Sequence, residues 1–330
     1  MFYEELYQIK IILPVAIIVS ALLPTSYIMA QSKNKSVSQA ENTASKVYYR
    51  KINAGGHNIF YRESGSQDAP VILLLHGYPT SSHMFRNLIP ILNEKYHVIA
   101  PDLPGFGYSD APCRDKFDYT FDNLAKVMQA FIDELKLKRF AVYVFDYGAP
   151  TGYRLMLTNP EKITGFISQN GNAYTEGLGS AWDGVKKYWE NNSDEDRDAL
   201  RGFVKEEELR FQYFTGVGDP ELVAPETYTL DQYFLDRPES DEKQLDLIGD
   251  YKNNVSLYPK FHEYFRKYQP KALIIWGNKD PYFLPAGAEA YKRDIPNATI
   301  KFYDTGHFAL ETHAEEIGND ILNFMETLPD

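Results

Sequence analysis

Apolar runs of strand length alternate with segments of helical periodicity along most of this chain. Residues 70–75, 98–100, 140–145 and 272–276 are solidly apolar, and 163–169 and 299–303 are apolar runs that include some polar residues. Segments with apolar positions at helical spacing lie at 84–92, 121–135, 151–157 and 314–325. Strands that are apolar on both faces and separated by helices are typical of a parallel sheet covered on both sides. The pattern predicts an α/β fold with a mostly parallel sheet flanked by helices.

Two stretches depart from this alternation. Residues 47–52 and 58–62 alternate in polarity around Ala54-Gly55-Gly56, which predicts a hairpin at the edge of the sheet. Between 172 and 271, helical segments with charge-rich connections replace the strands. A connection this long is rarely unstructured inside a compact domain, so we expect a helical cap over the strand ends. The core is then formed by residues 47–171 and 272–330.

The N-terminal stretch has a different composition. No charged residue occurs from Ile11 to Ser32, and the apolar run 11–23 has the length of the hydrophobic region of a signal peptide. Ala30 is small enough to precede a cleavage site. Residues 1–30 are predicted to be a signal peptide or, if uncleaved, a membrane anchor spanning residues 11–30. The polar residues 31–46 are predicted to be a disordered linker, and the protein to be exported, either periplasmic or secreted.

Composition narrows the classes of partner. The chain has 330 residues, of which 44% are hydrophobic, which is enough for a large core. A net charge of −12 argues against nucleic acid as a partner. The single cysteine, Cys113, excludes an internal disulfide. The sequence has no histidine pair at ligand spacing and no glycine-rich phosphate loop after a strand, so we expect neither a metal nor an organic cofactor. We expect a small-molecule substrate and water as partners, while no feature of the sequence indicates the oligomeric state.

The apolar run 140–145 ends at a single carboxylate, Asp146, followed by Tyr147, Gly148 and a helical segment. A strand, a sharp turn and a helix hold the residue at the turn in a strained conformation, and small neighbours such as Gly148 make room for it. This spacing is that of a nucleophile elbow, with an acid as the nucleophile. The alternative is that Asp146 caps the following helix.

Two further residues occupy the positions that a catalytic triad requires. His307 follows the last predicted strand in a glycine-containing turn, and Asp280 follows the strand before it. The chain order of nucleophile, acid and base is then Asp146, Asp280, His307, as in the α/β-hydrolase triad. The alternative for His307 is a histidine of a surface loop.

The run 70–75 leads into His76-Gly77-Tyr78-Pro79. In a fold of this kind, the loop after that strand and the residue after the nucleophile present backbone N–H groups to developing negative charge. These are the N–H groups of Tyr78 and Tyr147. We expect the peptide bond before Pro79 to be cis.

From about residue 47 to 325, the chain resembles the haloalkane dehalogenase and epoxide hydrolase branch of the α/β-hydrolases. The motifs that carry the resemblance are His76-Gly77-Tyr78-Pro79-Thr80-Ser81-Ser82, Asp102-Leu103-Pro104-Gly105-Phe106-Gly107-Tyr108-Ser109, the Asp146 elbow and Gly306-His307. The resemblance implies that Asp146 forms an alkyl ester with the substrate and that His307, oriented by Asp280, activates the water that hydrolyses it. A carboxylate suits saturated carbon because the ester it forms can be hydrolysed.

The chain departs from this family at the leaving-group site. The dehalogenases usually carry tryptophan after the nucleophile, and many carry Asn or Glu at the position of Tyr78; here Tyr147 follows the nucleophile. The segment Gly249-Asp250-Tyr251 resembles the one that supplies a proton-donating tyrosine in epoxide hydrolases or a halide donor in some dehalogenases. Tyr251 is therefore the candidate donor, although 25 tyrosines make a packing role an open alternative. A second donor is sought among Tyr174, Tyr213 and Tyr233.

The resemblance implies C–halogen or epoxide cleavage of small, neutral, apolar substrates. Carboxylate substrates are not expected, because the arginines that bind them in fluoroacetate dehalogenases are replaced here by Tyr147 and Pro150. Two other functions stay open at this point: hydrolysis of carboxylic esters or lactones, and ligand binding without catalysis.

Overall fold

The computed structural model of the protein describes residues 46–329. The predicted signal peptide or anchor and nearly all of the predicted linker lie outside the described residues, so export stays a prediction. Within residues 46–329, no helix combines the length and the hydropathy needed to cross a membrane.

Within residues 46–329, eight strands form one sheet in the order β1-β2-β4-β3-β5-β6-β7-β8. Their bounds are β1 Tyr48–Ala54, β2 His57–Ser64, β3 Val71–Leu75, β4 His97–Pro101, β5 Phe140–Phe145, β6 Ile163–Gln169, β7 Ala272–Gly277 and β8 Thr299–Tyr303. β1 and β2 form the predicted antiparallel hairpin at one edge, and β2 also pairs antiparallel with β4. From β4 to β8 every pairing is parallel.

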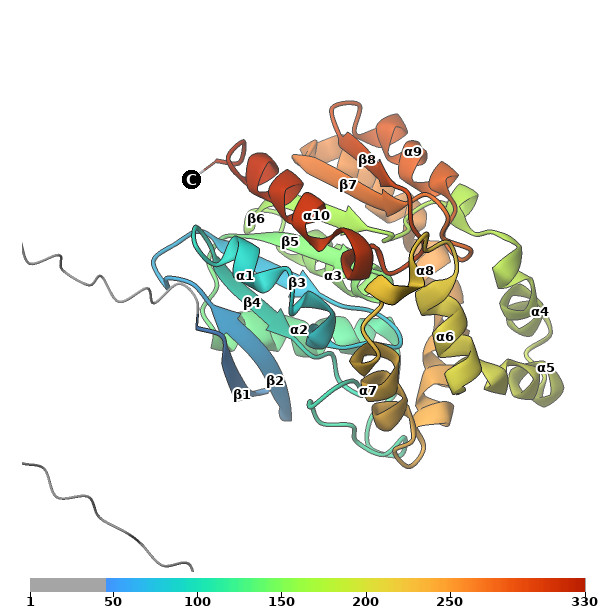
Figure 1. Cartoon of the computed structure of the whole chain (residues 1–330). Coiled ribbons are helices and arrows are strands. Elements are labelled where there is room, and N and C mark those ends of the chain that lie inside the picture. Colours follow the sequence, from blue (N-terminus) through green and yellow to red (C-terminus); the bar gives the residue numbers. More distant parts are fainter. Residues whose placement is uncertain (1–45, 330) are drawn as a thin grey trace, which may run out of the picture. The chain divides into compact units, whose positions relative to one another are not determined.

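The helices fall into two groups along the chain (Figure 1). Those among the strands are α1 Ile89–Leu92, α2 Phe121–Glu134, α3 Gly148–Thr158, α9 Pro285–Asp294 and α10 Ala309–Met325. Those between β6 and β7 are α4 Asp183–Asn191, α5 Asp194–Ala199, α6 Glu206–Phe214, α7 Glu226–Leu235 and α8 Ser240–Tyr268. Short 3-10 helices are η2 Ser82–Phe85, η3 Thr175–Gly177, η4 Ser180–Trp182, η5 Leu200–Val204 and η6 Pro220–Leu222. The predicted fold class, a mostly parallel sheet with an inserted helical cap, is confirmed.

Alternate residues of the strands face two separate hydrophobic cores. On β3, Leu73 and Leu75 belong to the core that also contains α2, α3, α8 and α9. Ile72 and Leu74 belong to the core on the other face, with η2, α1 and α10. Because side chains of a strand alternate between faces, strands buried on both sides need apolar residues at nearly every position. This explains the solid apolar runs of the sequence.

Two predicted helices differ in detail from the structure. The predicted helix 84–92 is divided into η2 and the single turn α1, which contains Pro90 near its start. Proline lacks the N–H that a continuous helix would need at this position. The closing helix begins at Ala309, five residues before the predicted start, and its backbone is kinked at His313, where φ is −132°.

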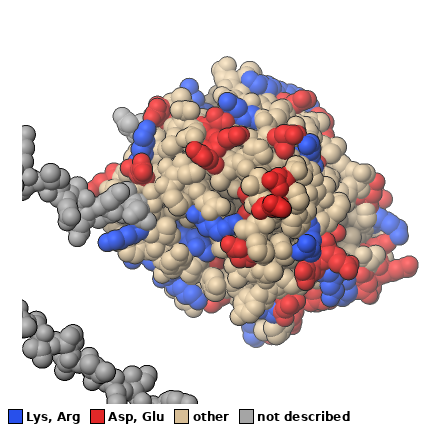
Figure 2. Space-filling model, viewed as in Figure 1, with Lys and Arg blue, Asp and Glu red and all other residues tan. Residues whose placement is uncertain are grey.

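Acidic and basic side chains are interspersed over the face seen in Figure 2. Among the described residues many such side chains form ion pairs, for example Arg197 with Glu242 at 2.6 Å and Arg114 with Asp246 at 2.6 Å. Although the net charge of the chain is −12, the acidic side chains do not form a single continuous patch on this face.

Candidate active site

The turn after β5 holds Asp146 in a strained backbone conformation. Its φ of +46° lies in the left-handed region, which Asn and Asp tolerate better than most residues. The helix α3 begins two residues later at Gly148, where a Cβ atom would lie 2.3 Å from the carbonyl oxygen of Leu75. The side chain of Asp146 does not cap α3, because the N-cap position is Tyr147 and no side chain caps it. The predicted elbow is present.

The Asp146 carboxylate faces backbone N–H groups. Its Oδ1 accepts a 2.5 Å hydrogen bond from the N–H of Tyr78, and the N–H of Tyr147 also lowers its pKa. Burial nevertheless raises the pKa of Asp146 from 3.8 to about 6, because it outweighs the charge of His307 and these two N–H groups. The close approach requires Gly77, since a Cβ there would lie 2.3 Å from Oδ1. The peptide bond between Tyr78 and Pro79 is cis, as predicted.

His307 and Asp280 meet beside this carboxylate. His307 Nδ1 lies 2.7 Å from Asp280 Oδ2, and His307 Nε2 lies 4.0 Å from Asp146 Oδ2. Burial lowers the pKa of His307, but the charge and hydrogen bond of Asp280 and the charge of Asp146 raise it by more, so that it lies above 6.5. All three predicted triad residues are thus brought together, with Nε2 on the side of the Asp146 carboxylate.

Asp280 is held by residues that the sequence analysis did not single out. Asn170 donates from Nδ2 to Asp280 Oδ2 at 2.7 Å, and its Oδ1 accepts from the N–H of Gly277 at 3.0 Å. The N–H groups of Tyr282 and Phe283 donate to Asp280 Oδ1. The signal for Asn170 was its place directly after β6, at the carboxyl end of a parallel strand, where such folds bind ligands.

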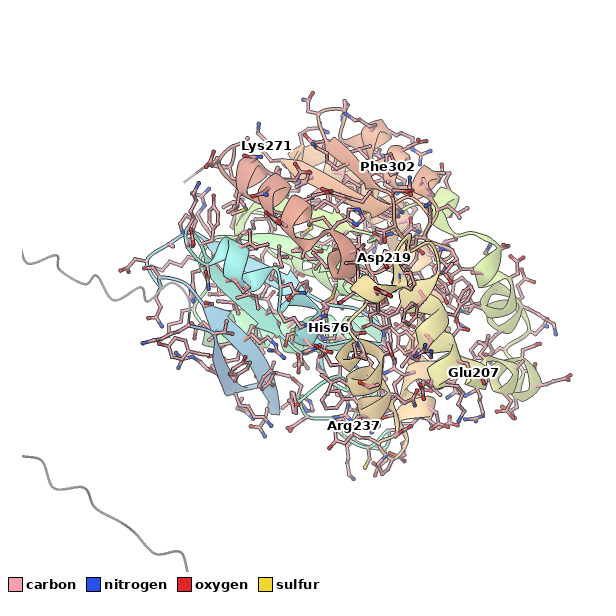
Figure 3. The ribbon with its side chains drawn as sticks, in the orientation of Figure 1. His76, Glu207, Asp219, Arg237, Lys271 and Phe302 are labelled. Atoms are coloured by element: carbon pink, nitrogen blue, oxygen red, sulfur yellow. The ribbon has the colours of Figure 1, made fainter. Side chains whose placement is uncertain are left out.

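His76 has a structural role next to the site (Figure 3). Its Nε2 accepts a 2.9 Å hydrogen bond from the N–H of Leu103, which leaves Nδ1 as the donor to the carbonyl of Gly77. Burial lowers the pKa of His76, which favours this neutral form. The histidine therefore ties the loop after β4 to the loop that presents the Tyr78 N–H.

A cavity of about 260 Å³ opens over the triad. Its lining combines Asp146 and His307 with apolar side chains of the helices between β6 and β7, chiefly Trp182, Val185, Leu200, Phe203 and Ile248. No Lys or Arg is among the described residues that line it. The cavity therefore suits a small, mostly apolar substrate without a carboxylate.

The predicted leaving-group tyrosines lie in three different environments. The Tyr78 hydroxyl donates to the carbonyl of Phe203 at 2.6 Å. Tyr147 lines the cavity, and its hydroxyl is buried without a hydrogen-bond partner among the described residues. The Tyr251 hydroxyl is buried and also has no hydrogen-bond partner among the described residues. Burial raises its pKa, and the neighbouring Tyr258 raises it further. Tyr251 itself does not line the cavity, because it packs behind Trp182 and Tyr147.

The other tyrosines proposed as donors are engaged or exposed elsewhere. Tyr174 donates to Asp294 and Tyr213 to Asp231, while Tyr233 is 66% exposed. None of the three lines the cavity described above.

Every tryptophan N–H of the protein already has an acceptor. The indoles of Trp182, Trp189 and Trp276 donate to the carbonyls of Tyr282, Ile248 and Phe283 at 3.0, 2.8 and 2.8 Å. These three are all the tryptophans of the sequence. An indole N–H is therefore not available in this arrangement to hold a departing halide, whereas the hydroxyl of the cavity residue Tyr147 has no partner among the described residues.

Four features of this structure together define the α/β-hydrolase class. They are a mostly parallel sheet with helices on both faces, an inserted cap, an elbow that carries Asp146, and an Asp-His pair at the strand ends. Residues 70–314 match the family model described as the alpha/beta hydrolase fold, so the chain belongs to this family. It is an α/β-fold hydrolase.

The chain is similar in sequence to hydrolases, among them haloalkane dehalogenases. It is 44% identical over 272 residues to an uncharacterized hydrolase of Saccharomyces cerevisiae, covering 81% of this chain and 93% of the relative. It is 40% identical to a haloalkane dehalogenase of Psychrobacter cryohalolentis over 113 residues, covering 34% of this chain and 37% of that one.

Solved structures share the fold. A loop variant of a haloalkane dehalogenase from Bradyrhizobium elkanii matches with a TM-score of 0.69 and 22% identity, covering 85% of this chain and 97% of that one. An epoxide hydrolase from Vigna radiata matches with a TM-score of 0.68 and 22% identity, covering 85% and 98%.

Proposed function

We propose that this hydrolase opens epoxides with water through an alkyl ester of Asp146. The observation that carries the proposal is the carboxylate itself, on a strained elbow, with Oδ1 bonded to the Tyr78 N–H and Oδ2 4.0 Å from His307 Nε2. A carboxylate nucleophile attacks saturated carbon to give an ester that water can cleave.

The first half-reaction forms the ester. Asp146 Oδ2 attacks a ring carbon, the C–O bond of the epoxide breaks, and the alkoxide takes a proton from a tyrosine hydroxyl. Tyr147 is the assigned donor, because its buried hydroxyl has no partner among the described residues and the residue lines the cavity. A positioned proton donor contributes roughly 10²–10⁴-fold to such a step.

The second half-reaction hydrolyses the ester. His307 takes a proton from water, which attacks the carbonyl carbon of Asp146, and the oxyanion that forms on Oδ1 is stabilised by the N–H groups of Tyr78 and Tyr147. Asp280 stabilises the charged imidazole, at 2.7 Å from Nδ1. When the intermediate collapses, the proton still on the attacking oxygen goes to the departing alkoxide, so that the diol leaves and the Asp146 carboxylate is restored. His307 returns the other water proton to the Tyr147 phenolate.

The second candidate is haloalkane dehalogenation, which the 40% identity to the Psychrobacter cryohalolentis enzyme favours. The engaged indole N–H groups argue against it. A panel that measures diol formation from styrene-type and alkyl epoxides beside halide release from short haloalkanes decides between the two. Diol formation without halide release supports the proposal, and the reverse result supports the dehalogenase.

We expect Tyr147→Phe to lower turnover of epoxides by about 10²–10⁴-fold, because an alkoxide leaving group needs a proton. On any haloalkane that reacts, the same change removes only one hydrogen bond to a charged group, worth about 1.5–3 kcal/mol or roughly 10–150-fold. Steady-state kinetics of Tyr147→Phe and Tyr251→Phe on both substrate classes measure this difference. If Tyr251→Phe shows the larger loss on epoxides, Tyr251 is the donor and Tyr147 is a packing residue.

We expect the two half-reactions to differ in pH dependence. Alkylation needs ionised Asp146, so its single-turnover rate should fall below about pH 6. Hydrolysis needs neutral His307, whose pKa lies above 6.5. As the pH is lowered, kcat should therefore begin to fall at a higher pH than the alkylation rate does. Between these values the alkyl-enzyme should accumulate, which rapid quenching and intact-protein mass spectrometry can measure.

A control for this pH profile is Asp280→Asn. Removing the carboxylate charge lowers the pKa of His307, so the pH below which kcat decreases should become lower. The pH below which the alkylation rate decreases should stay near 6. Profiles of alkylation and kcat that coincide in the wild type would contradict the assignment.

A further inference from the structure

One face of α6 adds a polar strip to the otherwise apolar cap side of the cavity. Glu208 and Gln212 are four residues apart on this helix and therefore lie on the same face, and both line the cavity together with Asp146 and His307. Neither residue has a part in the reaction proposed above. Both residues are placed to contact a molecule that occupies the cavity.

Glu208 has hydrogen-bonding capacity to spare. Its Oε1 accepts a 2.5 Å hydrogen bond from the Tyr282 hydroxyl, and within residues 46–329 no Lys or Arg forms an ion pair with it. An ionised carboxylate accepts about four hydrogen bonds, and a partly buried one is costly when they are not made. The free acceptor positions of Glu208 call for a donor.

Gln212 has the complementary need. The residue is only 3% exposed, and its Nε2 has no hydrogen-bond partner among the described residues. A buried amide N–H without an acceptor is destabilising, and native proteins rarely leave one unpaired. Because Gln212 lines the cavity, a molecule bound there can supply this acceptor.

We propose that Glu208 and Gln212 form a subsite for a hydroxyl group carried by the substrate. A hydroxyl is both donor and acceptor, so it can donate to the Glu208 carboxylate and accept from Gln212 Nε2 at once. An ammonium group has no acceptor and leaves Nε2 unpaired, and a carboxylate is repelled by Glu208 and Asp146. The substrate class is a short epoxide with a hydroxyl group away from the ring; this reaction class rests on the proposed function, whereas hydroxyl binding does not.

The kinetic test compares short 1,2-epoxyalkanes with the same compounds bearing a terminal hydroxyl. The wild type should prefer the best hydroxylated substrate in kcat/KM by roughly 10–100-fold, as expected for a hydrogen bond to a charged group. Glu208→Leu should bring this preference close to unity, whereas Gln212→Leu, which keeps the charged acceptor, should lower it by a smaller factor. The matched control is Glu207→Gln, which changes an exposed residue of the same helix and should leave both the preference and the activity unchanged (Figure 3).

A binding test keeps the subsite independent of the chemistry. Trp182 lines the cavity, so its fluorescence can report the binding of a short n-alkanol and of the methyl ether with the same number of heavy atoms. The wild type should bind the alkanol about tenfold more tightly than the ether, because only the alkanol can donate to Glu208, and Glu208→Leu should bind both alike. Equal binding of alkanol and ether by the wild type overturns the subsite, as does an alkylammonium ion that binds more tightly than the alkanol.

The two readouts separate the two proposals. Alkanol selectivity without turnover of any epoxide contradicts the proposed function and supports the subsite. Epoxide turnover with no hydroxyl preference in either test supports the proposed function and contradicts the subsite.

Discussion

Replacing Asp146 with asparagine should abolish turnover and at the same time stabilise the protein at pH 8. The amide cannot act as the nucleophile, and loss of a nucleophile in other hydrolases costs on the order of 10⁴–10⁶-fold in rate. Asparagine also tolerates the left-handed conformation of this turn, and its side-chain oxygen can still accept the hydrogen bond from the Tyr78 N–H. The substitution therefore removes the charge and keeps the backbone.

The gain in stability follows from the raised pKa. The folded-state pKa of Asp146 is about 6 against 3.8 for an unperturbed carboxyl, so above pH 6 the ionised side chain opposes folding by about 3 kcal/mol. Below about pH 4 the carboxyl is protonated in both states and the penalty vanishes. Denaturant unfolding should thus show Asp146→Asn to be more stable than the wild type at pH 8, with the difference lost near pH 4.

Asp146→Ala is the matched comparison for stability. It should be equally inactive, but alanine is strained at a φ of +46° and cannot accept from the Tyr78 N–H, so the gain in stability should be smaller or absent. An Asp146→Asn protein less stable than the wild type at pH 8 would mean that the ionised carboxylate is not destabilised by burial.

Replacing His307 with glutamine should stop the reaction after its first half. Asp146 can still be alkylated, but no base activates the water, so steady-state turnover should fall by about 10²–10⁴-fold while the covalent ester accumulates. Mass spectrometry of the intact protein should then show a mass increase equal to the whole epoxide, and digestion should locate it on the peptide that contains Asp146.

Two controls accompany this experiment. The double variant Asp146→Asn, His307→Gln should show no adduct. His57→Gln, which changes a histidine whose ring packs on Phe117 away from the cavity, should retain wild-type turnover. At a pH well above the pKa of His307, where the wild type accumulates no ester, it should show no adduct. If His307→Gln loses activity but no adduct appears with any substrate that the wild type converts, the ester mechanism is wrong.

The strands, the turn at Asp146 and the order of the triad could be read from the sequence because each depends on local features. Solid apolar runs reflect strands buried on two faces, as on β3, where neighbouring residues enter different cores. The small residue Gly148 reflects the close approach of the turn to Leu75. The helix at 84–92 was predicted as continuous because periodicity alone does not weigh the effect of Pro90.

The identity of the polar groups around the substrate was decided by tertiary structure alone. Asn170 supports Asp280 from a position 110 residues away in the sequence, and the side chains of Glu208 and Gln212 reach the cavity because of how α6 packs on the core. Tyr251 and Tyr147 have the same side chain, yet only Tyr147 lines the cavity, because Tyr251 lies behind Trp182. Local sequence determines turns and the faces of helices and strands, whereas contacts between distant segments determine which of those faces meet, and the partners of a hydroxyl or an amide depend on those contacts.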